Sequence, residues 1–535
     1  MKRLLMFLIG IVLILGLVGY SLAIYGEKWV NDNLESILNQ NPDQKYEFKL
    51  GEVDFKIFEG AIYLKNLKIN SLLPDTVTHV RGEIEEAFLR NVHPLKLIFN
   101  RHLLIDDLSF IHPTIQVNLF ANAEKKDRPG SALQEFFGEI LSKGEIENFQ
   151  LTRGAAVFFE NGSRSGTIYS LGILVNGLQT DSIKVQYPIP FEYKQVKFSF
   201  DSLVYQLADG QSLKLGKMHF DSELEQFALE DISLKYQEDI RQFARKQLYQ
   251  KDLIEVEVDS LKLTGFGPEI RLHSDVDIRA RKLELFGLDL RDFRDKALPR
   301  PKEDIKPMFQ GMITQVNFPL RLDTLKITDS KISYGESVPQ KNDFWTIHFD
   351  KLDARIVNLT TIHEYQKEKK SFDLEMSSSL EGFGQVNAKI VVPYERDEYQ
   401  LDLDFRNYSL PQLNQLLRPI MNGEIASGKL DRLALSLKAT EKTARVNLIF
   451  DYKELKVDLF NKSGEKKNKL MSSLANIAIN QSNMPGEKKY QQPNYTVIRN
   501  QYRGPFHLIW KSTKEGILEI IPGGAAKEIL MSTGN

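Results

Sequence analysis

The segment Val53-Asp-Phe-Lys-Ile-Phe-Glu-Gly-Ala-Ile-Tyr-Leu-Lys-Asn-Leu-Lys-Ile69 carries the pattern that decides the fold. Apolar and polar residues alternate on both sides of Glu59-Gly60. Successive side chains of a β-strand point to opposite faces of the sheet. The segment therefore predicts two strands joined by a turn, each with one apolar face and one polar face.

The same alternation returns along the chain, at residues 197–200, 254–263, 347–352 and 400–405. A sheet built from such strands is apolar on one side only, which is typical of antiparallel sheets. The sequence therefore predicts a mainly β fold based on an antiparallel sheet.

A weak internal repeat supports a sheet that grows by addition of similar units. Residues 105–117, 146–158 and 322–334 carry apolar residues at the same offsets. The middle of each repeat holds a pair that favours turns, namely His-Pro, Arg-Gly or Asp-Ser. Each repeat is therefore predicted to be an antiparallel hairpin. Such hairpins bury their apolar faces only by stacking side by side.

The N-terminus predicts a membrane anchor. Residues 4–24 contain no charged residue and follow Lys2-Arg3. At about 1.5 Å per residue they would form a helix of roughly 31 Å, close to the ~30 Å hydrocarbon core of a bilayer. The positive residues on the short N-terminal side place the rest of the chain across the membrane. A signal peptide cleaved after Ala23 is the alternative, and it would also export the chain.

Composition narrows the classes of function. The chain has no cysteine, which excludes a disulfide framework, thiol chemistry and a lipoprotein anchor. The 70 basic and 72 acidic residues give a net charge of −2, which argues against a nucleic-acid-binding protein. The charge balance therefore favours partners other than polyanions.

The known catalytic and metal-binding motifs are missing from the sequence. None of the nine histidines has the His-x-x-x-His spacing of a helical zinc site. A Gly-x-Ser-x-Gly elbow, a Walker loop and a Rossmann fingerprint are also missing. We therefore predict no catalytic residue, no metal site and no cofactor, and expect a protein that is not an enzyme.

Helical periodicity is sparse. It occurs at residues 29–38, 132–141, 238–249 and 412–417, which we predict to be covers or end caps of the sheet.

Loop-like breaks lie at residues 123–130, 299–307 and 461–469. The three prolines of residues 299–307 make this segment the predicted junction between two halves of the sheet. The predicted organisation is an anchor at 1–25, an N-terminal half at 26–300, a C-terminal half at 308–460 and a tail at 461–535.

The chain resembles the bacterial AsmA-like proteins, which are relatives of bridge-like lipid-transfer proteins. The resemblance rests on the N-terminal anchor, the strands at residues 53–58 and 62–69, and the segments at 104–108 and 112–117. A second patch runs from Phe405-Arg-Asn-Tyr-Ser-Leu-Pro-Gln-Leu-Asn414 to Gly423-Glu-Ile-Ala-Ser-Gly-Lys-Leu430. It is similar to the family's short helical element before a Ser-Gly-x-Leu strand. Together these patches cover about a third of the chain.

The resemblance implies an elongated, open, taco-shaped β-groove with an apolar interior. It also implies a protein that is held in the inner membrane of a didermal bacterium, with its bulk in the periplasm. Its expected role is lipid transport or outer-membrane homeostasis, with membrane lipids and other envelope proteins as partners.

Alternation alone does not distinguish an open groove from a two-layer sandwich. In a groove, acyl chains would cover an apolar surface that is costly to expose to water. The residues predicted to line it belong to two segments: Leu325, Ile327, Ile332 and Tyr334 in one, and Leu401, Leu403 and Phe405 in the other.

Two functions remain open at this point. The first is a groove that binds or conducts lipids, with phospholipid as the expected cargo. The second is a membrane-anchored scaffold or assembly factor whose sheet is filled by its own side chains. An enzyme without a recognised motif is a third interpretation.

Overall fold

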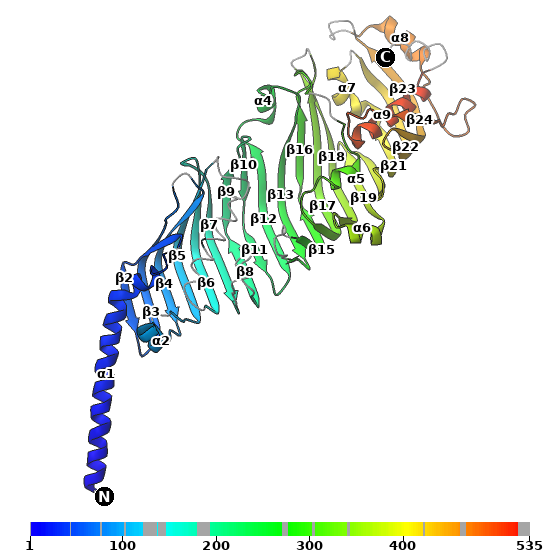
Figure 1. Cartoon of the computed structure of the whole chain (residues 1–535). Helices are drawn as coiled ribbons and strands as arrows, with labels where there is room; N and C mark the ends of the chain where they lie inside the picture. The colour runs from blue at the N-terminus through cyan, green and yellow to red at the C-terminus, as the bar shows by residue number, and fades with distance from the viewer. Residues whose placement is uncertain are drawn as a thin grey trace. The chain divides into compact units, whose positions relative to one another are not determined.

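The computed structural model describes residues 2–42, 44–74, 77–100, 103–120, 136, 146–178, 193–269, 277–301, 305–339, 343–420, 423–460 and 467–522. These residues are mainly β, as predicted, and their strands belong to one large mixed sheet that an apolar N-terminal helix precedes (Figure 1). The chain divides into two compact units. Unit 1 runs up to Leu229, and unit 2 contains Glu230–Pro268 and the residues from Asp277 onward.

The elements of unit 1 are α1 (Lys2–Leu38), β1 (Tyr46–Lys49), β2 (Glu52–Lys56), β3 (Ala61–Ser71), β4 (His79–Arg90), α2 (Pro94–Asn100), β5 (Asp107–Leu119), β6 (Asn148–Glu160), β7 (Ser163–Asn176), β8 (Gln195–Phe200), β9 (Ser202–Gln206), β10 (Gln211–Leu215) and β11 (Met218–Asp221). Strand β12 (Gln226–Tyr236) follows and leads into unit 2.

The later elements are α4 (Ile240–Arg245), β13 (Asp252–Thr264), β14 (Gly267–Glu269), β15 (Asp277–Phe286), β16 (Asp289–Arg294), α5 (Phe309–Ile313), β17 (Leu320–Ser337), β18 (Phe344–Thr360), α6 (His363–Lys369), β19 (Ser371–Leu380), β20 (Gly384–Pro393), β21 (Tyr399–Ser409), the 3₁₀-helix η2 (Leu410–Leu413), α7 (Asn414–Ile420), β22 (Gly423–Ala439), β23 (Thr443–Leu459), α8 (Lys469–Ala478), β24 (Asn494–Ile498) and α9 (Pro505–Ile520). The segment predicted as a junction, residues 299–307, falls within the range of unit 2.

The sheet is mainly antiparallel, as predicted, but it also contains parallel pairs. Most neighbouring strands are antiparallel, including the series from β17 to β24. However, β5 and β6 are parallel, and β17 runs parallel to both β15 and β16. Parallel neighbours need a crossover of a dozen or more residues. The connections from β5 to β6 and from β16 to β17 are long enough for this, and alternation within a strand carries no information about its neighbour's direction.

The internal repeat is a bulged strand and not a hairpin, so that prediction was wrong. Apart from the first two residues of the repeats at 105–117 and 146–158, each repeat lies within a single strand, β5, β6 or β17. His112, Arg153 and Asp329, at the predicted turns, have φ values of 50°, 54° and 48°. Each is thus a left-handed residue at a β-bulge or local kink, where an extra residue reverses the alternation. Because both a bulge and a turn interrupt period-two alternation, the sequence pattern did not separate them.

Helix α1 is continuous from Lys2 to Leu38, so the predicted anchor and the predicted helix at 29–38 are one element. Its described part includes a stretch long and apolar enough to cross a membrane, and almost none of that stretch is buried against the protein. Its last turns pack on the first strands of unit 1, where Val30 and Leu34 are fully buried.

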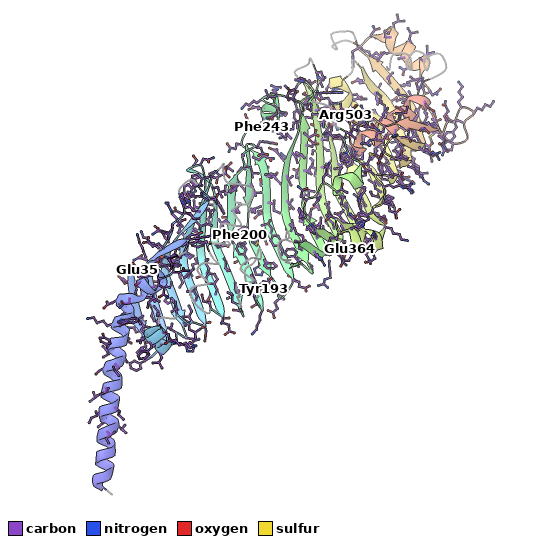
Figure 2. All side chains as sticks on the ribbon, in the orientation of Figure 1. Glu35, Tyr193, Phe200, Phe243, Glu364 and Arg503 are labelled. Atoms are coloured by element: carbon purple, nitrogen blue, oxygen red, sulfur yellow. The ribbon has the colours of Figure 1, made fainter. Side chains whose placement is uncertain are left out.

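Side chains of α1 also bind the backbone of the first strands. Asn31 Oδ1 accepts a hydrogen bond from Phe55 N at 2.8 Å, and Glu27 Oε1 accepts one from Ile57 N at 2.9 Å. Glu35, labelled in Figure 2, accepts a hydrogen bond from Leu50 N at 2.7 Å. Helix α1 therefore covers backbone groups of β2 and of the residues beside it that would otherwise be open to other strands.

The other predicted helices have mixed outcomes. Residues 238–249 and 412–417 coincide with α4 and with η2 and α7. The prediction at 132–141 lies outside the described residues except for Phe136, which is helical and buried. The predicted break at 123–130 also lies outside them.

Candidate functional site

The cross-strand register of unit 2 aligns apolar side chains into two rows on one face of the sheet. We call them the apolar rows. The first contains Leu283, Leu325, Ile356, Leu374, Ile390, Leu401, Leu437 and Val446, and the second contains Leu285, Ile327, Ala354, Met376, Ala388, Leu403, Leu435 and Leu448. Each row crosses eight neighbouring strands, from β15 and β17 to β23.

The remaining predicted residues share this face. Ile332 and Tyr334 lie opposite Phe349 and Ile347 of β18, and Phe349 lies opposite Leu380 of β19. In β19, which pairs with β20 without interruption, Leu380 and Met376 are four residues apart and so point the same way. The irregular pairing between Ile327 and Ile332 is what keeps both halves of β17 on one face.

All seven predicted residues therefore lie on one side of the sheet, since Phe405 follows Leu403 by two positions in β21. That they contact lipid stays a prediction.

The apolar rows are buried at one end and partly exposed at the other. Leu435 and Leu448, in β22 and β23, are 0% exposed. Every member in β15, β17, β18 and β19 is partly exposed. The rows therefore pass from a dry core into a surface that water reaches.

Helix α9 explains the buried end. A Cβ atom on Gly516 of α9 would lie 2.5 Å from Leu448, so the helix packs directly on the rows. The Tyr495 hydroxyl of β24 donates a hydrogen bond to Ser512 O of α9 at 2.6 Å. The protein's own helix thus fills the apolar face over the last strands.

Two segments that connect strands, one containing α5 and the other α7, pack at the edges of the apolar face. Met308 N and Gly311 N, around the start of α5, donate to the Asp397 carboxylate in the β20–β21 turn at 2.8 Å and 2.9 Å. Phe309 packs edge-on against Tyr399 of β21. Helix α7, which follows β21, contacts β18 as well as β22. Because these contacts join strands that are not neighbours, the sheet of unit 2 curls toward its apolar side.

A group of polar residues interrupts this face where β16 and β17 end. We call Asp252, Asp292, Arg294, Tyr334 and Glu336 the polar rim. Arg294 forms a two-point ion pair with Asp252, and the Tyr334 hydroxyl donates to Glu336. In the register, Asp292 lies opposite Tyr334 and Arg294 lies opposite Glu336. Of these five residues only Tyr334 was predicted from the sequence, because the other four alternate as residues of an ordinary polar strand face do.

Two further side chains complete the rim's surroundings. Lys296 pairs with Glu336 at 2.6 Å, and Trp345 packs edge-on against the Tyr334 ring with centroids 5.8 Å apart. Indole and phenol rings beside fixed charges are typical of the boundary between apolar and aqueous surroundings.

Asp292 is the least satisfied member of the polar rim. Its Oδ1 atom is buried and has no hydrogen-bond partner among the described residues. Burial, with the neighbouring negative charge of Asp252, raises the pKa of Asp292 from 3.8 to about 7. The carboxyl is therefore protonated in part of the molecules near neutral pH. Its Oδ1 atom can accept a hydrogen bond from a ligand.

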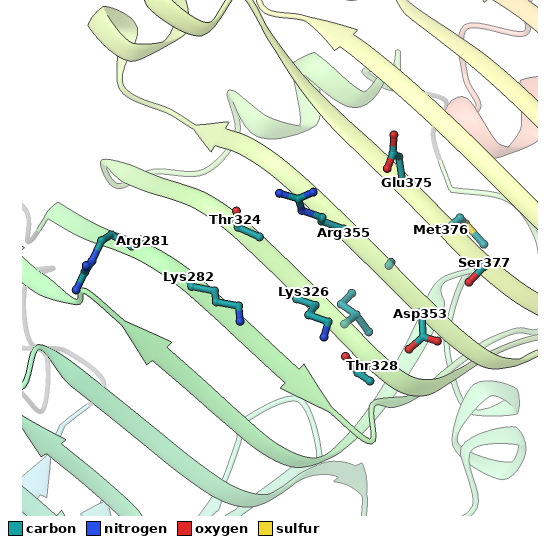
Figure 3. A pocket seen from close by; sticks show the side chains of 12 residues that line it. Arg281, Lys282, Thr324, Lys326, Thr328, Asp353, Arg355, Glu375, Met376 and Ser377 are labelled. Carbon is teal, nitrogen blue, oxygen red and sulfur yellow. The ribbon is translucent and has the colours of Figure 1, made fainter.

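The opposite face of the same strands is polar and carries an open hollow of about 880 Å³, lined in part by Lys282, Lys326, Arg355 and Glu375 (Figure 3). Lys326 lies opposite Arg355, and neither has an ion-pair partner among the residues that the structure describes. A neighbouring hollow is lined in part by Asp402, Asp404 and Arg432. The linings also include members of the second apolar row, among them Ile327 and Met376, so both hollows are of mixed character, whereas the apolar rows contain no charged residue.

Unit 1 has apolar rows of the same kind. One joins Ile62, Leu89, Leu108, Phe149, Val175 and Val196, and another joins Leu64, Ala87, Phe110, Leu151, Ile173, Phe198 and Phe220. Their members are buried from β3 to β6, near α1, whereas Ile173, Val196 and Phe198 are partly exposed.

Among the described residues, no cluster of three or more histidine or acidic side chains is arranged to hold a metal ion.

No protein-family model matches the sequence of this chain, and no curated protein matches it significantly.

Proposed function

We propose that this chain is an inner-membrane-anchored periplasmic protein whose apolar rows bind or conduct the acyl chains of phospholipids for outer-membrane homeostasis. The observation that carries the proposal is the partial exposure of the rows over four consecutive strands of unit 2, β15 and β17 to β19. Exposed apolar surface costs about 25 cal/mol per Å². A ligand that needs no directional contacts would relieve this cost, and acyl chains are such a ligand.

The mechanism in this proposal is passive. Acyl chains would lie along the apolar rows, and headgroups would meet the polar rim, where Arg294, Asp292 and Tyr334 offer charges and hydrogen bonds. No covalent step is needed. Membership of the AsmA-like family, the periplasmic location and the anchor at residues 4–24 are parts of the same proposal. Helix α1 supports the anchor by its length and composition.

A second candidate function is a membrane-anchored scaffold or assembly factor without lipid cargo. The burial of Leu435 and Leu448 under α9 favours it, because there the protein fills its own apolar face. The two candidates differ in whether the partly exposed end of the rows holds lipid.

Lipid extraction from the purified full-length chain, followed by mass spectrometry, tests the proposal. The wild type should carry phospholipid, and Ile327→Glu should lose most of it, since the charge would lie within the rows. Thr328→Glu is the matched control, because Thr328 follows Ile327 by one position in β17 and so points to the opposite face of the sheet. Wild-type protein free of lipid, or equal lipid in both variants, would favour the scaffold.

A further inference from the structure

Three large apolar side chains stand exposed in unit 1 beside helix α1. Phe58, in the turn between β2 and β3, is 72% exposed. Leu95 and Phe99, on helix α2, are 69% and 76% exposed. Exposed apolar residues that gather in one place commonly mark a contact with a membrane or another protein.

Contacts with α1 show which part of that helix these residues lie beside. The Phe58 ring stacks on Tyr20 of α1, with centroids 6.2 Å apart. Helix α2 reaches α1 through Ile98, whose Cδ1 would lie 2.9 Å from a Cβ atom on Gly26. The exposed side chains therefore lie on elements that contact α1 between residues 20 and 26, which is where its uncharged segment ends.

The distance along the helix places Phe58 inside the apolar layer if residues 4–24 span a bilayer. Tyr20 precedes Ile24 by four residues, which is about 6 Å along a helix. Elements that lie in a membrane interface bury their apolar side by roughly 5–10 Å. The stacked Phe58 ring falls within that range.

The neighbouring side chains fit the same boundary. Tyr20 and Tyr25 are 57% and 70% exposed, and tyrosine is enriched where a membrane helix meets water. Lys96 of α2 is exposed between Leu95 and the buried Leu97. A lysine stem can lie along apolar surface while its ammonium group reaches the lipid phosphates.

We propose that Phe58, Leu95 and Phe99 form a collar around α1 that inserts into the lipid bilayer at the interface. The collar would hold the first strands of unit 1 on the membrane surface. A lipid bilayer is the proposed partner of the collar because the apolar surface of α1 continues into the collar at the Tyr20–Phe58 contact. The inference rests on the proposed membrane anchor, but it adds a second contact that the anchor alone does not require.

The experiment uses the absence of cysteine from the chain. Phe58→Cys and Phe99→Cys are labelled with a nitroxide in the full chain and reconstituted into phosphatidylethanolamine–phosphatidylglycerol vesicles. Collision rates with oxygen, which concentrates in the bilayer, and with a water-soluble nickel chelate are measured by electron paramagnetic resonance. Leu13→Cys on α1 is the membrane reference, and Phe383→Cys, at a residue 66% exposed in unit 2, is the aqueous reference.

We expect the ratio of oxygen to nickel collisions at positions 58 and 99 to be several-fold higher than at 383 and lower than at 13, because oxygen concentrates toward the centre of the bilayer and the collar lies at its interface. Ratios at 58 and 99 that match 383, with a high ratio at 13, would overturn the collar and leave the anchor standing. Low collision rates with both reagents at 58 and 99 would reveal a protein partner and also overturn it. A low ratio at 13 would refute the anchor itself, and the collar with it.

Discussion

Leu325 of β17 lies directly opposite Ile356 of β18, and on the other face of the same two strands Lys326 lies opposite Arg355. One pair belongs to the apolar rows and the other to a charged hollow. Consecutive residues of the same strand thus point to an apolar face and to a charged face of the sheet. This contrast underlies the proposed function and makes it accessible to paired substitutions.

A charge in the apolar rows should be tolerated at their partly exposed end and not at their buried end. Leu435→Glu would place an unpaired carboxylate in a dry site and should cost about 3–5 kcal/mol of unfolding free energy. Leu325→Glu, at a partly exposed member, should cost about 1 kcal/mol. Thermal denaturation of both variants measures the difference. Equal, severe destabilisation would mean that the rows are packed throughout, as in a scaffold.

The like charges of Lys326 and Arg355 predict a stabilising reversal. Glu284 of β15 lies opposite Lys326 on its other side, so the test uses a Glu284→Gln background. There Lys326→Glu should form a cross-strand ion pair with Arg355 and raise the unfolding free energy by roughly 0.5 kcal/mol. The same substitution in an Arg355→Gln background is the matched control, and there the gain should vanish. Urea denaturation at low salt measures both. A gain that persists without Arg355 would assign the effect to another group.

Asp292 predicts a pH-dependent stability. Its folded-state pKa is raised to about 7, so the unfolded state ionises first. The protonated Asp292 carboxyl contributes to the free energy of unfolding fully below about pH 4, and this contribution is lost as the pH rises through 7. Asp292→Asn should therefore gain stability over the wild type between pH 4 and 8, by about 1–2 kcal/mol after solvent screening. A difference between the two proteins that does not change with pH would refute the raised pKa.

Asn39 is predicted to hold the first edge of the sheet. Its side chain accepts a hydrogen bond from Phe48 N at 2.9 Å and donates one to Phe48 O at 2.7 Å. Asn39→Ala should cost about 1–3 kcal/mol and speed hydrogen exchange in β1. Asn33→Ala is the control, because the Asn33 amide donates to Trp29 O within α1. Equal exchange in both variants would show that Asn39 does not protect this edge.

Period-two alternation predicted the strands and their faces well. The hairpin around Glu59-Gly60 is confirmed as β2 and β3, and all seven predicted lining residues share one face. These predictions succeeded because they depend only on local geometry. The parallel pairs, the bulges at His112 and Asp329 and the packing of α9 depend on residues far apart in sequence, and no local pattern marks them.

The polar rim could be predicted only in part. Leu290, Asp292 and Arg294 alternate along β16, so their common face was readable from the sequence. Which of the two faces joins the apolar rows depends on the parallel pairing with β17. The raised pKa of Asp292 depends further on its burial and on Asp252 of another strand. The chemistry of the rim therefore becomes visible only in the folded chain.

Photocrosslinking along β17 tests most directly whether the apolar rows hold lipid. A benzophenone amino acid is placed singly at positions 325, 326, 327 and 328 of the full chain in cells labelled with radioactive phosphate, and lipid attached to the purified protein is counted. We expect lipid at 325 and 327, on the apolar face, and little at 326 and 328, on the polar face. Equal labelling at all four positions, or none at 325 and 327, would contradict the proposed lipid binding.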